Sequence, residues 1–341
     1  MARTKYSLLA LDGGGIRGVI PARVLDAIEQ RTGRPISQLF DLVAGTSTGG
    51  ILALGLNKPA ARGSSKPAYT ASNLLDFYLD EGETIFPRMS VWDRVKNPLG
   101  LAGVRYSATP LEGLLAERFG ATMLSEALTE ICIPSYDLSK PAAYFFKREY
   151  ARDEDHAWDT PMALAARATS AAPTYFNPAN VGDHALIDGG VFSNNPAAAA
   201  YADALDLWGH DVEIQVISIG TGQPPQEMGR GPIPVAYANA NGWGLAHWAR
   251  PVLEVVFDGV AEAVEYQLTR LCRHADGDRP RYHRLQSGLP TAAHAMDDAS
   301  ATNLRRLMDD ASTLIREEAA ELEQICSILE DVAADRDAAL V

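Results

Sequence analysis

The sequence predicts an α/β fold built around a parallel sheet. An apolar stretch, a tight glycine turn and a helical pattern follow one another twice within the first 57 residues, and this succession is typical of parallel strands joined by helices. The first strand is expected at 5–11 before a helix at about 21–31, and the second at 39–44 before a helix at 48–56. Further apolar runs that fit strands lie at 130–138, 142–150, 185–187 and 213–219.

The remaining elements follow from hydrophobic periodicity. Two segments, 85–105 and 223–244, lack a clear period, and we expect irregular covers there. No repeat and no convincing break divides the 341 residues, so they are expected to share one domain. Helical patterns lie at 72–79, 110–118, 196–207, 252–271 and 303–332, and a last strand is expected at 281–285.

Charge excludes some classes of partner. The net charge of −14 disfavours nucleic acid, because a protein that binds a polyanion needs clustered cations. It also disfavours strong electrostatic binding to anionic lipid. Residues 295–341 carry twelve acidic side chains and four arginines, so the rest of the chain is nearer neutral and one face could still approach a membrane.

Apolar runs and cysteines indicate the compartment. No apolar run approaches the roughly 20 residues that cross a bilayer, and the run at 8–11 is too short for a signal peptide. Cys132, Cys272 and Cys326 are odd in number, far apart and not in a metal-binding pattern. We therefore expect no disulfide framework and a cytoplasmic location.

A serine lies between the second strand and its helix, in the pattern Gly45-x-Ser47-x-Gly49. Flanking glycines permit a tight, strained turn that holds the hydroxyl clear of the backbone. The N-terminus of the following helix favours negative charge nearby. The pattern predicts a nucleophile, although a serine that only caps the helix is the alternative.

The first strand ends in a glycine loop, Asp12-Gly13-Gly14-Gly15-Ile16-Arg17-Gly18. Its spacing also fits a dinucleotide-binding loop, but that fold needs an acidic residue at the end of the second strand, whereas Asp41 lies at its start. The backbone N–H groups of consecutive glycines can instead converge on one oxyanion. Arg17 is a candidate to brace the loop or to meet a phosphate-bearing head group, with a structural salt bridge as the alternative.

A third motif, Asp188-Gly189-Gly190, follows a short strand. Ligands gather at strand ends on one edge of an α/β sheet, so the Asp188 carboxyl is a candidate base, with an ordinary Asp-Gly turn as the alternative. A conventional triad needs a histidine, and none of the seven stands in an obvious strand-end motif. The simpler hypothesis is a pair in which Asp188 takes the proton of Ser47 directly, with desolvation strengthening the base. The histidines are His156, His184, His210, His247, His274, His283 and His294.

Taken together and in this order, the three motifs resemble those of the patatin-like phospholipases, in particular bacterial patatin-like acyl hydrolases. Supporting stretches are Leu39-Phe40-Asp41, the segment 168–176 and Asn194-Asn195-Pro196. The resemblance covers 6–222, which is expected to be the catalytic core, with 223–341 as an extension of the same domain that ends in an acidic amphipathic helix.

The resemblance implies a three-layer α/β/α fold with a mostly parallel sheet and a Ser-Asp dyad that needs no metal or other cofactor. It implies a lipid acyl hydrolase that cleaves fatty-acyl esters through an acyl-enzyme. Ser47 would be the nucleophile and Asp188 the base, with 168–176 walling the acyl cleft. Gly13, Gly14 and Gly15 would form the oxyanion hole, and the motifs would be supported by Asp12, Arg17, Gly18, Gly45, Gly49, Gly189 and Gly190. An acyltransferase on the same scaffold and a lipid-binding regulatory protein with an inactive site are the alternatives.

The expected partner is a phospholipid or another acyl lipid at a membrane or micelle surface. Trp92, Trp243 and Trp248 lie in or beside the irregular covers and are candidates to enter such a surface, with core packing as the alternative. Five apolar residues line one face of the helix at 303–332. That face either supports self-association or packs on its own domain; its residues are Leu304, Leu307, Leu314, Leu322 and Ile325.

Overall fold

A computed structural model of the chain describes residues 3–88, 103–152, 158–223, 242–244, 248, 251–272 and 280–339. Its centre is an eight-stranded sheet with the order β5-β6-β3-β2-β1-β7-β8, in which β4 also pairs with β3. Four of the pairings are parallel and three, which involve β4, β5 and β6, are antiparallel. The strands are β1 Lys5–Leu11, β2 Leu42–Gly45, β3 Glu130–Asp137, β4 Ala142–Lys147, β5 Ala179–Val181, β6 His184–Asp188, β7 Glu213–Ile219 and β8 Tyr282–Leu285.

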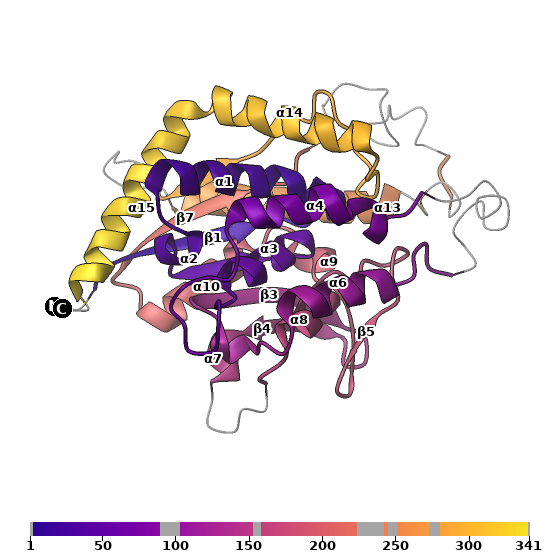
Figure 1. Cartoon of the computed structure of the whole chain (residues 1–341), viewed down its shortest axis with the longest axis horizontal. Helices are drawn as coiled ribbons and strands as arrows, with labels where there is room; N and C mark the ends of the chain where they lie inside the picture. The colour runs from indigo at the N-terminus through magenta and orange to yellow at the C-terminus, as the bar shows by residue number, and fades with distance from the viewer. Residues whose placement is uncertain are drawn as a thin grey trace.

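Helices cover both faces of the sheet, as the predicted three-layer α/β/α fold requires (Figure 1). On one face lie α1 Val19–Thr32, α2 Ile36–Leu39, α3 Thr48–Asn57, α4 Ala71–Ile85, α6 Thr109–Phe119, α8 Met162–Thr169, α14 Ala301–Glu317 and α15 Ala319–Ala339. On the other face lie α10 Ala197–Trp208 and the end of α13 Pro251–Leu271. Two short helices, α7 Arg148–Ala151 and α9 Gly190–Ser193, follow β4 and β6.

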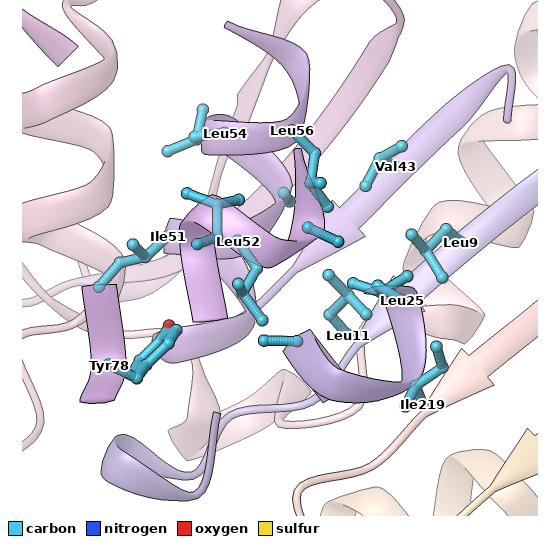
Figure 2. Packing of buried hydrophobic residues seen from close by; sticks show 14 of the residues in the cluster. Leu9, Leu11, Leu25, Val43, Ile51, Leu52, Leu54, Leu56, Tyr78 and Ile219 are labelled. Carbon is cyan, nitrogen blue, oxygen red and sulfur yellow. The ribbon is translucent and has the colours of Figure 1, made fainter. Parts of the chain in front are cut away.

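Successive side chains of β1 point to opposite faces of the sheet, so they pack into two separate hydrophobic cores. Leu9 and Leu11 pack into the larger core, which Figure 2 shows with side chains of α1 and α3 around them. Leu8 and Ala10 point to the opposite face and pack against α10. From Ser7 to Leu11 both faces of β1 are fully buried, which is typical of the central strand of a parallel sheet.

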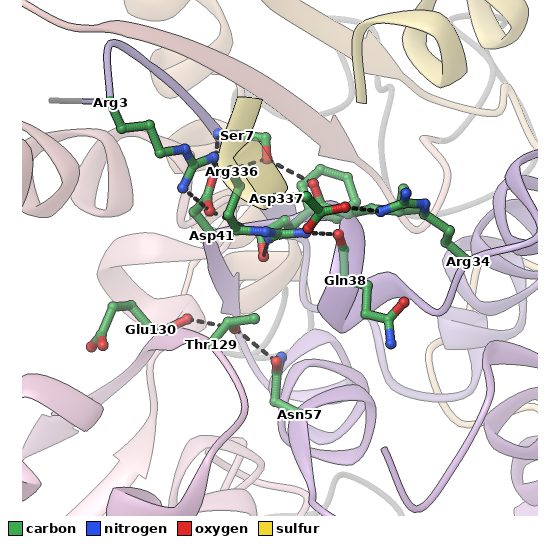
Figure 3. Close-up of polar contacts among 12 residues, drawn as sticks. Arg3, Ser7, Arg34, Gln38, Asp41, Asn57, Thr129, Glu130, Arg336 and Asp337 are labelled. Carbon is green, nitrogen blue, oxygen red and sulfur yellow. Dashed lines mark hydrogen bonds and ion pairs between the residues drawn. The ribbon is translucent and has the colours of Figure 1, made fainter. Parts of the chain in front are cut away.

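Strand register brings two of the three predicted motifs, the glycine loop and the serine turn, to one edge. β1 and β2 run parallel, with Leu11 opposite Gly45, and Ile219 of β7 lies on the other side of Leu11. The loops that follow these strands therefore leave the sheet next to one another. At the opposite edge, Asp41 accepts two hydrogen bonds from Arg3, at 2.5 and 2.7 Å (Figure 3). An acidic residue at that edge is far from the glycine loop, which agrees with the rejection of a dinucleotide site.

The structure corrects three predicted elements. Residues 36–39 form a helical turn and β2 begins only at Leu42, so the strand predicted at 39–44 starts too early. The strand predicted at 142–150 ends at Lys147, where α7 begins. The single helix predicted at 303–332 is two helices, α14 and α15, interrupted at Glu318. Figure 1 shows the chain changing direction between them.

The C-terminal helices pack on the same domain. The five apolar residues predicted to line one face of the helix at 303–332 are all buried in the larger core. Self-association stays a prediction, and it would have to use another surface. The covers predicted at 85–105 and 223–244 lie largely outside the described residues. Within the described ranges, no helix combines the length and apolarity needed to cross a bilayer.

Candidate active site

Ser47 occupies a strained turn between β2 and α3. Its φ is +55°, a value that residues with a side chain rarely adopt, and its hydroxyl makes no capping hydrogen bond to α3. The structure therefore disfavours a role limited to capping. Gly49 is required here because a Cβ atom at this position would collide with the carbonyl of Leu11. Gly45 is equally restricted, since its Cβ would collide with the carbonyl of Gly49.

Two threonines hold this turn in place. The N–H of Ser47 donates to Oγ1 of Thr169 at 3.0 Å, and that hydroxyl donates to the carbonyl of Pro134 on β3 at 2.6 Å. The hydroxyl of Thr46 donates to the carbonyl of Ser193 at 2.6 Å. All of these groups are buried, so the turn is tied to β3 and to α9 by bonds that water does not compete for.

Asp188 ends β6 and is fully buried. Its Oδ1 accepts the N–H of Gly190 at 2.8 Å, and its own N–H donates to the carbonyl of Ala171. Burial raises the pKa of the Asp188 carboxyl to about 7, because the charged form loses its hydration. Hydrogen bonds from the Ser47 hydroxyl and from the N–H of Gly190 act in the opposite direction and limit the rise of the pKa.

The Ser47 hydroxyl lies close to the Asp188 carboxyl, but the two groups do not form a hydrogen bond of standard geometry. The hydroxyl influences the pKa of the carboxyl as a hydrogen-bond donor. Nevertheless, Oδ2 of Asp188 is buried and has no partner at standard hydrogen-bond geometry among the described residues. Catalytic hydrogen bonds are often long or bent before a substrate binds, and this arrangement fits that behaviour. The structure thus brings together two groups that are 141 positions apart in the sequence.

One cavity contains both groups and is otherwise mainly apolar. Its empty volume is about 600 Å³, including the part that is open to solvent, and it is bordered by Ser47, Asp188, Gly14 and Gly15. The segment 168–176 contributes Ser170, Ala172, Tyr175 and Phe176, so it lies where the sequence predicted a wall. The other lining residues are Ile16, Thr48, Ile51, Tyr78, Ile85, Phe86, Leu111, Phe257 and Met296.

Two of the three glycines predicted to form the oxyanion hole line this cavity. In the described part of the chain, the N–H groups of Gly14 and Gly15 have no hydrogen-bond partner, and both residues line the cavity. Gly13 differs, because its N–H donates to the carbonyl of Asn194 at 3.0 Å and the residue does not line the cavity. Gly15 has a φ of +59°, a conformation that glycine adopts without strain.

Asp12 and Arg17 do not line the cavity, and their side chains hold the glycine loop in place. Asp12 is paired with Arg284 of β8 through two contacts of 2.9 and 2.5 Å, and both side chains are buried. Burial raises the pKa of Asp12, while the guanidinium of Arg284 acts against that rise. Arg17 donates to the carbonyls of Gly14 and Gly222 at 3.4 and 3.3 Å. It braces the loop as predicted, although mainly through backbone carbonyls.

The remaining predicted residues serve close packing. A Cβ at Gly18 would collide with the hydroxyl of Thr48, and one at Gly189 with the carbonyl of Pro134. Gly190 donates its N–H to Asp188 and packs on Phe257.

The described histidines lie away from the cavity lining. Two have carboxylate partners at 2.6 Å, since His184 contacts Asp137 and His283 contacts Glu321. No group of three His, Cys, Asp or Glu residues in the described ranges could hold a metal.

The sequence also matches a known protein family. The model of the family described as patatin-like phospholipase matches residues 9–201, more than half of the chain. The chain belongs to this family. Patatin-like protein 2 of Arabidopsis thaliana is 30% identical, over 93% of this chain and 84% of the relative. Patatin-like protein 1 of the same plant is 28% identical, over 96% of this chain and 85% of the relative.

Membership of the patatin-like phospholipase family implies a hydrolase that acts on acyl lipids. A further relative, from Solanum tuberosum, is named probable inactive patatin-3-Kuras 1 and is 27% identical over 92% of this chain and 87% of its own length. Among solved structures, VipD from Legionella pneumophila covers 92% of this chain and 67% of that chain at 12% identity, with a TM-score of 0.37. The curated relatives named here are plant proteins, so the expectation of a bacterial enzyme stays a prediction.

Two residues that support the patatin-like site come from distant parts of the chain, and the three short motifs do not include them. Arg284 pairs with Asp12 from 272 positions away, and Thr169 holds the serine N–H from 122 positions away. Thr169 belongs to the predicted 168–176 segment, so its place in a motif was a usable signal. Arg284 lies in the strand predicted at 281–285, and no local pattern distinguishes it from a surface arginine.

Arg284→Met is expected to destabilise the fold by about 3–5 kcal/mol, because it leaves the Asp12 carboxylate buried without its partner. Arg34→Met is the control: Arg34 forms an exposed ion pair with Asp337, and its loss is expected to cost less than about 1 kcal/mol. Urea unfolding measures both. The double variant Asp12→Asn/Arg284→Met should lose clearly less stability than the sum of its single changes; strict additivity would show that the pair is not coupled.

Asp188→Asn should change how stability depends on pH. The folded pKa of Asp188, about 7, lies above the unfolded value near 3.9, so the neutral carboxyl stabilises the fold at low pH. That contribution is complete below about pH 4 and is lost as the pH rises through about 7. Relative to the wild type, the variant should therefore gain a few kcal/mol between those pH values in urea unfolding. Parallel pH profiles for the two proteins would contradict the raised pKa.

Proposed function

We propose that this protein hydrolyses fatty-acyl esters of phospholipids or lysophospholipids through a Ser47-Asp188 dyad and an acyl-enzyme. The observation that carries the proposal is the shared cavity, in which a strained serine, a buried carboxyl and two N–H groups without partners among the described residues meet apolar walls. The apolar lining suits a fatty-acyl chain, and the polar groups gather where an ester carbonyl would react.

In the first half-reaction, Oγ of Ser47 attacks the ester carbonyl carbon and Asp188 accepts the hydroxyl proton. The oxyanion of the tetrahedral intermediate receives hydrogen bonds from the N–H groups of Gly14 and Gly15, a contribution of about 3–4 kcal/mol per donor in comparable sites. Collapse of the intermediate breaks the ester C–O bond, and Asp188 returns its proton to the departing alcohol.

In the second half-reaction, water attacks the acyl-enzyme while Asp188 accepts one of its protons. The fatty acid leaves as the proton returns to Oγ of Ser47, which restores the enzyme. An ordinary aspartate is a weak base at neutral pH, whereas a carboxyl with a pKa of about 7 is well matched to this task. No step involves a histidine or a metal ion.

Lipid access is proposed to occur beside the N-terminal end of α13. Trp248, Val252 and Val255 are 39%, 46% and 38% exposed, and Trp243 lies edge-on against Trp248 at 5.2 Å between ring centres. Phe257, on the same helix, lines the cavity, so α13 contributes both to this exposed apolar surface and to the acyl site. We propose that this surface enters a lipid interface and that the protein is cytoplasmic and peripheral at the membrane. Trp92 lies outside the described residues.

Ser47→Ala is expected to abolish esterase activity, with a loss of at least about 10³-fold in kcat, because the nucleophile is gone. Mass spectrometry over a panel of phospholipids, lysophospholipids and galactolipids, with wild type and variant, identifies the substrate. A fluorophosphonate probe should label the wild type at Ser47 and leave Ser47→Ala unlabelled. Full activity in Ser47→Ala would refute the dyad, and an unlabelled, inactive wild type would favour a lipid-binding protein. Product transfer to an added alcohol or thiol in preference to water would favour the acyltransferase.

Replacing the proposed docking surface should weaken membrane binding. Trp248→Ala combined with Val252→Ser and Val255→Ser is expected to reduce flotation with phosphatidylcholine vesicles by about 10-fold or more, because buried apolar area drives such binding. The matched control replaces Tyr266 and Leu271, which are 61% and 65% exposed near the other end of α13, by serine. Activity on a soluble short-chain ester should stay unchanged in both variants. Failure of the wild type to float at any lipid composition would contradict docking.

A further inference from the structure

Asp297 follows Met296, which lines the cavity, and binds two residues that lie behind the cavity wall; Asp297 does not line the cavity itself. Its Oδ2 atom accepts a hydrogen bond from Nη1 of Arg105 at 2.5 Å and another from the hydroxyl of Tyr106 at 2.8 Å. The side chain of Asp297 is only 14% exposed, so water competes weakly for these bonds. One carboxylate oxygen therefore fixes two consecutive side chains that lie more than 190 positions away.

Tyr106 supports the aromatic wall of the cavity. Its ring lies 5.6 Å from that of Phe86, 6.0 Å from that of Phe176 and 6.4 Å from that of Tyr175, between centroids. Each of these three partners lines the cavity, whereas Tyr106 is behind them. The hydrogen bond from its hydroxyl to Asp297 holds the Tyr106 ring in position. The ring thus limits how far the three lining residues can move.

Arg105 supports the same wall through its charged guanidinium and its backbone N–H. Its guanidinium lies 4.5 Å from the centre of the Tyr175 ring, in the geometry of a cation–π contact. The N–H groups of Arg105 and Tyr106 donate to the carbonyls of Thr174 and Tyr175 at 2.8 and 2.9 Å. Thr174 has a φ of +71°, so the wall contains a strained residue that persists because its surroundings hold it.

The residue before Asp297 reaches the glycine loop. The carbonyl of Met296 accepts the N–H of Ile16 at 2.9 Å and packs directly against Gly15, and Met296 itself lines the cavity. Asp297 therefore stands between the loop that is proposed to bind the oxyanion and the wall that is proposed to bind the acyl chain.

We infer that Asp297 is a positioning residue that sets the acyl-chain preference of this protein by fixing the aromatic wall of the cavity. The inference rests on the proposed esterase function for its substrate. A long acyl chain contacts the wall along its length, so its binding depends on the wall being held in place. A short chain occupies only the region near Ser47 and depends on it little.

Asp297→Asn tests this in a series of p-nitrophenyl esters from butyrate to palmitate. The variant keeps the size of the side chain but removes the charge that binds Arg105. We expect kcat/KM for the long-chain esters to fall by about 10-fold, the effect of losing one charge-assisted hydrogen bond. For butyrate we expect a change of less than about 3-fold. Tyr106→Phe, which keeps the ring and loses only its hydroxyl, should show the same trend to a smaller degree.

The matched control is Glu130→Gln. Glu130 forms an ion pair of similar length and burial with Arg148, at 2.6 Å, and neither residue lines the cavity. This variant should leave the dependence on chain length unchanged. A loss of equal size for every ester in Asp297→Asn, or the same profile in Asp297→Asn and Glu130→Gln, would overturn the inference.

A binding measurement separates this inference from the proposed function. In a Ser47→Ala background, where no ester is cleaved, displacement of a fluorescent long-chain fatty acid reports on the cavity alone. Adding Asp297→Asn should weaken binding of the long-chain acid by about 10-fold and Tyr106→Phe by less. If the wild type cleaves no ester but this difference is found, the esterase proposal fails and the role of Asp297 stands. Unchanged binding in both variants would overturn that role.

Discussion

The strained backbone at Ser47 is the constraint on which the rest of the site depends. A left-handed conformation at a residue with a side chain costs about 1–3 kcal/mol and persists only where the surroundings over-determine it. Here β2 leads directly into the turn, α3 leads directly out, and Thr169 holds the serine N–H. The absence of a Cβ at Gly49 lets the end of β1 pass beside the turn, so that the glycine loop and the serine share one edge of the sheet.

Two buried carboxyls at this edge have different surroundings and, as a result, different chemistry. Asp12 faces the guanidinium of Arg284, which stabilises its charged form and makes it an anchor for the loop. Burial raises the pKa of both carboxyls. At Asp12 the Arg284 guanidinium opposes the rise, whereas Asp188 has only a hydroxyl and a backbone N–H as partners and its pKa is about 7. A carboxyl that is neutral or charged with nearly equal ease can take up and return a proton, and an aspartate paired with an arginine cannot do so readily.

Much of the fold and the central part of the site could be predicted because the signals are local. The buried run at 5–11 became β1, and the glycines around Ser47 became a tight turn because few other residues fit there. Elements decided by distant contacts could not be predicted. No proline or glycine lies between 301 and 339, yet the helix is interrupted at Glu318. There α14, which packs on α1, gives way to α15, which contacts α1, α2 and β1. The motif predicts that the N–H of Gly13 binds the oxyanion. In the structure this N–H donates to the carbonyl of Asn194, a distant contact that the motif does not reveal.

The last third of the chain completes the site that the first two thirds begin. The family match ends at residue 201, and Ser47, Asp188 and the glycine loop all lie inside it. However, Arg284 neutralises Asp12, Met296 holds the N–H of Ile16, and Phe257 closes part of the cavity, and all three come from beyond that limit. β8 also extends the sheet next to β7, so it cannot be removed without exposing a central strand edge. The proposed nucleophile and base can therefore be located from short motifs, but the buried surroundings of Ser47 and Asp188 depend on the whole chain.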